Sequence, residues 1–366
     1  MVDNIEEIIR SENKSRVKWG FIWAFTCAVL WGLGYVAISM LWIVPPIGDF
    51  SIFPDGSAGF LVATICITTA MAIAFSIVLA IVWSGSLGKL ADIPRTLRAY
   101  KISKWYVFAA AFGGPIAIFG STLAVGYIGA AFSASAALLC SVVGAFAAKV
   151  WYSENITRRV WIGIGLILFG GIFIWNPSQM MAEIMNPASP DGVWLGYLGG
   201  IMSAIGWGLE GAIAARVLDM TDADTGLVVR FISEALIWSL ILVPVSMFLF
   251  GFDVMTTALV GTFTSPSFLI WLTIAALSLG VCYIALYKAY PLIGVGRGLS
   301  IGTLYVVFAI LSLSIFMGVP IGWGIIVGAS IAVIGTFVMY WDSGCDSAME
   351  CTRDCAPAVE GIGRVD

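Results

Sequence analysis

Ten apolar stretches, separated by short polar connections, constrain the fold of this chain more than any other feature of its sequence. Each holds about 17 to 26 residues, and a helix of about 20 apolar residues crosses the ~30 Å hydrocarbon core of a bilayer. Backbone polar groups find no water there, so apolar stretches without strict alternation are predicted to be helices rather than barrel strands. We therefore predict an all-α polytopic membrane protein with ten transmembrane helices. The predicted spans are residues 19–43, 58–83, 105–127, 130–151, 160–176, 193–216, 231–250, 268–288, 299–317 and 322–341.

Composition supports this class and excludes others. Charged residues make up 11% of the 366 residues, against about 25% in a soluble domain. No histidine occurs, so the chain lacks the commonest general base and the commonest metal ligand, and we predict no metal site and no cofactor. No basic stripe is present, which argues against nucleic-acid binding.

The distribution of lysine and arginine predicts the orientation in the membrane. Short cytoplasmic connections retain positive charge. With a cytoplasmic N-terminus, all 18 lysines and arginines fall in inner connections, inner span ends or the two tails. We therefore predict cytoplasmic tails at 1–18 and 342–366. We also expect the protein in the cytoplasmic membrane of a prokaryote. The predicted outer connections, which contain no lysine or arginine, are 44–57, 128–129, 177–192, 251–267 and 318–321.

The seven cysteines divide into two groups. Four of them, Cys27, Cys66, Cys140 and Cys282, lie in apolar stretches and are interpreted as small packing residues. The other three, Cys345, Cys351 and Cys355, lie in the C-terminal tail with a spacing that fits no zinc pattern. Palmitoylation or no role is expected for these three.

Two similar halves are visible in the sequence. A shift of 165 residues superimposes positions of spans 4 and 5 on spans 9 and 10, whereas Trp31-Gly32-Leu33 matches Trp207-Gly208-Leu209 at a shift of 176. We expect a longer connection between spans 2 and 3 than between spans 7 and 8 to absorb the difference. Five spans per half is an odd number, so the halves at 19–176 and 193–341, joined by an external linker at 177–192, are predicted to form an inverted repeat. The positions paired at 165 include Ser135 with Ser300, Leu139 with Leu304, Gly163 with Gly328 and Gly170 with Gly335.

These features resemble the EamA-type members of the drug/metabolite transporter superfamily. The family carries in each half a Gly-Glu followed by two spaced glycines, and Glu154, Gly163 and Gly170 keep that spacing, with Ser153 in place of the first glycine. The second half keeps Gly318, Gly328 and Gly335 but has Val319 in place of the glutamate. The proline common in spans 4 and 9 is absent near Val142 and Val307. The resemblance implies a transporter whose central cavity is lined by spans 1, 6, 8 and 9.

Glu210 is the first candidate for chemistry, because a carboxylate inside a span usually faces a cavity or a partner. In a cavity it would hold a cationic solute or exchange a proton with it. The alternative is a structural acid at the inner interface that pairs with Arg216, Lys149 or Lys288.

Two further charged residues are candidate coupling groups or charge partners. Glu234 follows Arg230 by one helical turn and is interpreted first as half of an ion pair at the inner interface, and second as another carboxylate in the path. Lys288 is expected to snorkel at the inner end of span 8 or, alternatively, to neutralise Glu210.

Five aromatic residues complete the predicted solute site. They lie in the four spans that the resemblance places around the cavity, and an aromatic cage with one acid suits an ammonium group. Packing between helices is the alternative for each of them. The five are Trp31, Tyr35, Trp207, Tyr283 and Tyr305.

We therefore expect a secondary transporter that moves a small polar organic metabolite by alternating access, with proton or sodium coupling as an option. A cationic or zwitterionic amine is the preferred solute class, and a neutral or anionic metabolite such as a sugar or amino acid is the alternative. The sequence leaves the direction of transport and the oligomeric state open. No Walker-type nucleotide motif is present. A membrane-embedded enzyme is less favoured, because no histidine and few intramembrane acids are available for it. A channel or a sensor is the third class considered.

Overall fold

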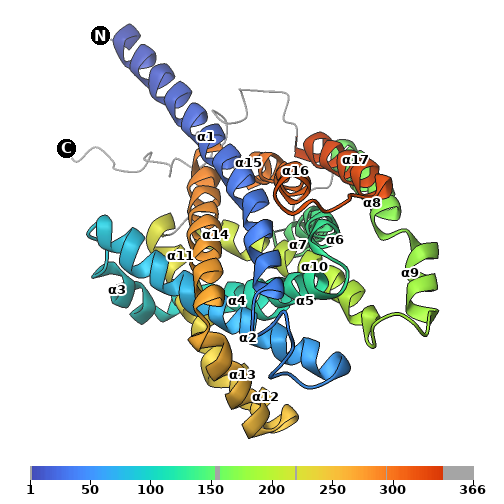
Figure 1. Ribbon diagram of the computed structural model, residues 1–366. Coiled ribbons are helices and arrows are strands. Elements are labelled where there is room, and N and C mark those ends of the chain that lie inside the picture. Colours follow the sequence, from blue (N-terminus) through green and yellow to red (C-terminus); the bar gives the residue numbers. More distant parts are fainter. Residues whose placement is uncertain (1, 153–156, 219–220, 294, 341–366) are drawn as a thin grey trace.

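The computed structural model describes residues 2–152, 157–218, 221–293 and 295–340. Most of these residues are helical, and no strand occurs among them (Figure 1). The helices of the first half are α1 (Val2–Ile43), α2 (Gly56–Ile77), η1 (Val78–Ser84), α3 (Asp92–Arg98), α4 (Tyr100–Ala111), η2 (Phe112–Ile118), α5 (Phe119–Tyr127), α6 (Ala130–Ala136), η3 (Ala137–Leu139), α7 (Cys140–Tyr152) and α8 (Arg158–Trp175).

The second half is equally helical. The short helix α9 (Pro177–Met185) lies in the predicted external linker and joins the two halves. The helices that follow are α10 (Val193–Leu218), α11 (Ala223–Ile237), η4 (Trp238–Leu242), α12 (Val243–Phe250), α13 (Phe252–Thr264), α14 (Pro266–Ile293), α15 (Val295–Gly302), α16 (Tyr305–Met317) and α17 (Trp323–Tyr340).

Eight helical segments of the described residues are long and apolar enough to cross a membrane, and Trp323–Met339 is apolar but shorter. The chain is thus an all-helical, multi-pass membrane protein. The count of ten spans, the inverted repeat and the cytoplasmic termini stay predictions. The N-terminal part of α1 continues the first span and projects from the bundle (Figure 1). The tail cysteines Cys345, Cys351 and Cys355, and the motif residues Ser153 and Glu154, lie outside the described residues.

The predicted start of the seventh span is wrong. The seventh span does not begin at 231, because α11 already begins at Ala223. Asp222 caps this helix, and its side chain accepts a hydrogen bond from the backbone N–H of Thr225. Arg230 therefore lies two turns inside the helix and not in an inner connection.

Glycine lets α8 and α17 pack at very short range. A β-carbon on Gly170 would lie 2.5 Å from the carbonyl oxygen of Gly328, and one on Gly163 would lie 2.7 Å from that of Gly335. Such backbone contact needs small residues at the interface. The two helices lie side by side at the edge of the bundle in Figure 1.

Several spans contain local departures from α-helical geometry. Pro115 lies in the π-helical turn η2, and η1 and η4 are π-helical turns in the second and seventh spans. π-helical turns change the local hydrogen bonding and often occur at functional sites. Two of these turns, η2 and η4, adjoin the charged cluster described next.

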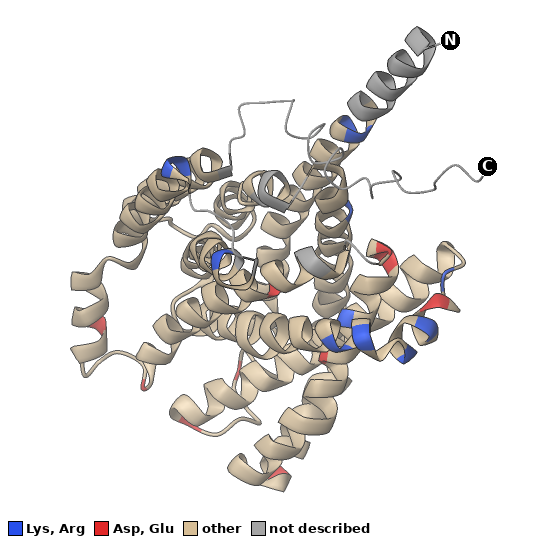
Figure 2. Cartoon of the chain, turned by 180° about the vertical axis from the view of Figure 1, so that it is seen from behind, with Lys and Arg blue, Asp and Glu red and all other residues tan. Residues whose placement is uncertain are grey.

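The charged residues are sorted by side. In Figure 2 the lower edge of the molecule carries acidic segments and no basic ones, whereas the lysines and arginines lie above it. The predicted outer connections contain the acids Asp49, Asp55, Glu183, Asp191 and Asp253 and no lysine or arginine. This pattern agrees with the predicted orientation.

Candidate functional site

Arg230 is a fully buried arginine in the middle of the bundle, and it binds two carboxylates. Its Nε donates to Oε1 of Glu210 at 2.7 Å, and its Nη1 donates to Oε2 of Glu234 in a short hydrogen bond. All three side chains are at most 5% exposed. We call Glu210, Arg230 and Glu234 the triad.

The triad is assembled by two helices and accommodated by a third segment. Arg230 and Glu234 lie one turn apart on α11, and Glu210 comes from α10. Opposite them lies η2: a β-carbon on Gly113 would collide with the Glu210 carboxylate, and one on Gly114 would lie 2.5 Å from Cδ of Glu234. The two glycines therefore leave the volume that the triad fills.

The charges of the triad do not balance. Two carboxylates and one guanidinium leave a formal charge of −1, and an unbalanced charge in a low-dielectric interior is costly. Nη2 of Arg230 and Oε1 of Glu234 also have no hydrogen-bond partner among the described residues. One proton on a carboxylate, or one further cation close by, makes the cluster neutral.

The five aromatic residues that the sequence predicts as a group lie close together, and we call them the aromatic cage. They are Trp31, Tyr35, Trp207, Tyr283 and Tyr305. Trp31 lies at its centre, with ring centroids 4.6 Å from Tyr305, 5.4 Å from Trp207 and 5.9 Å from Tyr283. Tyr35 stacks on Tyr305 at 6.1 Å. Hydrogen bonds fix two of the rings, because Trp207 Nε1 donates to the Tyr283 hydroxyl at 3.1 Å and the Tyr305 hydroxyl donates to the Ala134 carbonyl at 2.7 Å.

A small cavity lies against the cage. It has a volume of about 20 Å³, enough for one water molecule, and four cage residues line it together with Ser121 and Thr122. No charged side chain lines it. The hydroxyl of Tyr35 has no hydrogen-bond partner among the described residues. The cavity is therefore too small for an organic molecule.

Tyr283 connects the cage to the triad. Its ring centroid lies 5.5 Å from Cζ of Arg230 and 5.1 Å from the ring of Phe231, which itself covers the guanidinium at 4.0 Å. The triad thus lies one aromatic layer behind the cavity. At this range a change of charge in the triad alters the electrostatic potential at the cavity.

The structure corrects two sequence interpretations. Lys288 does not neutralise Glu210, because its Nζ lies 3.1 Å from Asp224 Oδ1. Glu234 does pair with Arg230, but deep in the protein and not at the inner interface. The side chain of Arg216 lies outside the described residues, and Lys149 is exposed.

The sequence predicts the pairing of Arg230 with Glu234 but neither its depth nor its contact with Glu210. A charge beside an apolar stretch normally marks the end of a span, which favours the inner interface. The available signal was its spacing of four residues from Glu234, which predicts an ion pair but not its depth.

Comparison with known proteins shows a similarity of fold but identifies no family. No protein-family model matches the chain, and no curated protein matches it. A solved structure described only as a "Crystal structure of protein" has a TM-score of 0.52 and 16% sequence identity, over 87% of this chain and 96% of that one. The similarity extends to the fold alone.

Proposed function

We propose that this protein is a secondary transporter that exchanges a small organic cation for a proton across the cytoplasmic membrane. The observation that carries the proposal is the triad, in which two buried carboxylates share one guanidinium beside an aromatic cage. Buried acids in a membrane protein generally mark ion or solute pathways.

Helix boundaries support an inverted repeat, the architecture on which alternating access commonly relies. The segment η1 ends at Ser84 and α12 at Phe250, a difference of 166, and the next spans begin at Tyr100 and Pro266, again a difference of 166. The connections between spans 2 and 3 and between 7 and 8 are therefore equal in length, and the sequence-based prediction of a longer first one is wrong. The change of register lies one connection earlier: α1 ends at Ile43 and α2 begins at Gly56, whereas α10 ends at Leu218 and α11 begins at Ala223.

Helix breaks and close contacts follow the same relation. The 3-10 turn η3 covers Ala137–Leu139, and the break between α15 and α16 covers 303–304, which correspond to residues 138–139 under the 165-residue shift. The contacts of Gly163 with Gly335 and of Gly170 with Gly328 exchange with one another under the 165-residue shift. This exchange is what a two-fold axis between α8 and α17 produces.

The charge of the triad supplies a reason for exchange. Its formal charge of −1 is balanced by one proton or by one cationic group at the cage, and binding of both leaves an excess positive charge in the interior. A solute ammonium held over the aromatic rings gains cation–π attraction of about 2 kcal/mol or more. The proton and the solute therefore bind in competition, which is the requirement for antiport.

A neutral solute, such as a sugar, is the second candidate. It is favoured by the walls of the cavity, where hydroxyls of Ser121 and Thr122 and aromatic rings occur without a charged side chain. In that case Arg230 neutralises Glu210 permanently, and the triad only holds α10 to α11.

The test uses purified protein in liposomes that contain a pH indicator. Radiolabelled quaternary and primary amines, sugars and amino acids are offered with and without an imposed pH gradient, to wild type and to Glu210→Gln and Glu234→Gln. We expect amine uptake driven by the gradient in wild type and at least a roughly tenfold loss of that uptake in the glutamine variants. Sugar uptake that is indifferent to the gradient and to both substitutions overturns the exchange proposal in favour of the second candidate.

A further inference from the structure

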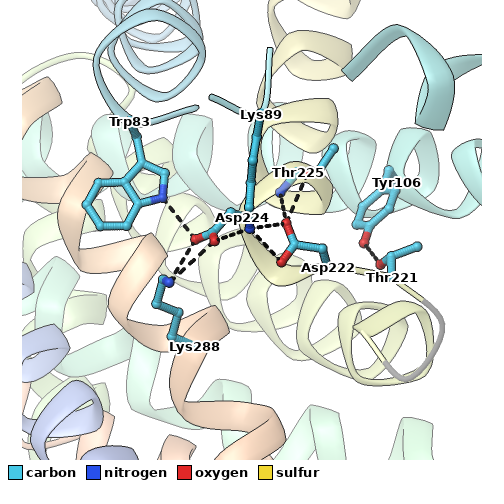
Figure 3. A network of polar contacts seen from close by, with 8 residues as sticks. All are labelled: Trp83, Lys89, Tyr106, Thr221, Asp222, Asp224, Thr225 and Lys288. Carbon is cyan, nitrogen blue, oxygen red and sulfur yellow. Dashed lines mark hydrogen bonds and ion pairs between the residues drawn. The ribbon is translucent and has the colours of Figure 1, made fainter. Parts of the chain in front are cut away.

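A second charged network lies at the other end of α11, on the side where lysine and arginine gather. Asp224 is its centre: Oδ2 lies 2.7 Å from Lys89 Nζ, and Oδ1 lies 3.1 Å from Lys288 Nζ (Figure 3). Trp83 Nε1 donates to Oδ1 of Asp224 at 2.9 Å, and Lys89 Nζ also lies 2.9 Å from Asp222. We call Trp83, Lys89, Asp222, Asp224 and Lys288 the inner network.

The inner network joins the ends of three spans. Trp83 belongs to the last turn of η1, Lys89 follows in the connection to α3, Asp222 and Asp224 begin α11, and Lys288 lies near the end of α14. Asp224 is 6% exposed. Partial burial opposes the charge of Lys89, but hydrogen bonds to Asp224 and Asp222 outweigh it and raise the pKa of Lys89, which stays charged at neutral pH.

A cavity of about 380 Å³ adjoins this network. Asp222, Asp224 and Lys288 line it, with Trp23 and Leu218 on its apolar side. Nζ of Lys288 lies 5.7 Å from the ring of Trp23 and 5.5 Å from that of Trp83, so the ammonium is held between two indoles. The ion pair of Asp224 with Lys288 and the ring of Trp23 therefore form part of the cavity wall.

The opposite end of the bundle is closed by aromatic contacts. There Phe60 stacks on Tyr127 at 4.3 Å and lies 5.0 Å from Phe50 and 5.7 Å from Trp42. Among the described residues, no ion pair connects the helices at this end. An aromatic stack separates without leaving a charge unpaired, whereas separation of the inner network leaves Asp224 without its lysines.

We propose that the inner network is a latch that closes the cytoplasmic end of the solute path and must break before the path opens to the cytoplasm. This proposal rests on the proposed function, because a transporter whose path opens alternately to the two sides must close the path at its cytoplasmic end. Separation of α14 and η1 from α11 at Asp224 joins the 380 Å³ cavity to the space around the cage.

Two native cysteines report on this opening. Cys27 follows Trp23 by one turn of α1, and Cys282 precedes Lys288 by less than two turns of α14, so both lie just beyond the latch. Their Sγ atoms are 3.5 Å apart and both residues are fully buried. A thiol reagent that enters from the cytoplasmic side reaches them only when the latch is open.

The experiment measures the rate at which a membrane-impermeant maleimide labels Cys27 and Cys282 in inside-out vesicles, read by peptide mass spectrometry. Asp224→Asn removes the charge that three donors share, and we expect labelling about tenfold faster than in wild type. Cys66, buried in α2, serves as the internal control for unfolding. Asp92→Asn is the matched control variant, because it breaks the exposed pair with Arg95 on the same side without touching the latch.

Lys288→Met provides a second variant should Asp224→Asn fail to fold, and it is expected to speed labelling in the same direction. Unchanged labelling in the folded variants, or faster labelling of Cys66 as well, overturns the latch. The assay needs neither a solute nor a proton gradient. Its failure is therefore separate from failure of the transport proposal, which the liposome experiment decides.

Discussion

The carboxylate of Glu210 lies against Gly113, at a distance that leaves no room for a β-carbon. The repeat relation that pairs Trp207 with Trp31 assigns Glu210 to Gly34, and the 166-residue shift assigns Gly113 to Leu279. Gly34 and Leu279 are also in contact, with the leucine side chain in the space that a β-carbon of Gly34 would occupy. In both contacts the glycine belongs to the first half and the large side chain to the second, and of the two large side chains only Glu210 is charged.

This contact predicts the effect of Gly113→Ala. The added methyl group displaces Glu210 or Arg230, and overpacking of this kind costs about 1–3 kcal/mol before the loss of ion pairing is counted. We expect a lower Tm in detergent and loss of solute-induced stabilisation. Gly211→Ala is the matched control, because it adjoins Glu210 on α10 and its β-carbon would enter open space. Equal Tm values for the two variants would contradict the packing described for the triad.

Arg230→Met tests the energetics of the triad. The variant leaves two buried carboxylates without a counter-charge, and such a loss costs about 3–5 kcal/mol. A large decrease in the denaturant midpoint is expected. The triple variant Glu210→Gln, Arg230→Met, Glu234→Gln carries no charge at these positions and should recover most of the stability while it lacks coupled transport. If the single and triple variants unfold alike, charge imbalance is not what destabilises the first.

Trp31 is expected to control solute affinity, because it contacts three other members of the cage. Loss of a cation–π contact of about 2 kcal/mol raises KM roughly 30-fold in Trp31→Leu. Trp194→Leu is the control, since Trp194 lies on the exposed surface of α10. Uptake kinetics in liposomes measure both variants, and an unchanged KM in Trp31→Leu would exclude the cage as the solute site.

The inverted repeat makes a topological prediction about two related connections. Ser86 lies between η1 and α3, and Asp253 lies at the start of α13, near the position 166 residues later; both are exposed. In a background without native cysteines, Ser86→Cys should react with an impermeant maleimide only from the cytoplasmic side, and Asp253→Cys only from outside. Reaction of both from the same side would rule out inversion.

Features of the structure that a single stretch of sequence determines could be predicted, whereas contacts between distant helices mostly could not. The helical membrane class followed from apolar stretches, because the bilayer leaves few alternatives to helices. The five cage residues, which the sequence groups together, do contact one another, whereas their role as a solute site stays a prediction.

The charged partners were not predictable in the same way. Arg230 and Lys288 both stand near predicted span ends, yet one binds Glu210 deep in the bundle and the other binds Asp224 at the inner end. Hydropathy describes the preference of one residue for lipid or water, whereas the depth of a buried charged side chain depends on its partners from other helices. The glycines of η2 that make room for the triad show the same limit, because glycine-rich stretches occur at many helix contacts that bind nothing.

Proton release on solute binding tests the central claim most directly. Purified protein in weakly buffered detergent solution is titrated with a stabilising quaternary amine while a pH indicator records released protons. The exchange account predicts close to one proton released per protein in wild type and almost none in Glu210→Gln or Glu234→Gln, where one carboxylate already balances Arg230. Saturable binding of the amine without proton release, or equal release in wild type and both variants, would contradict it.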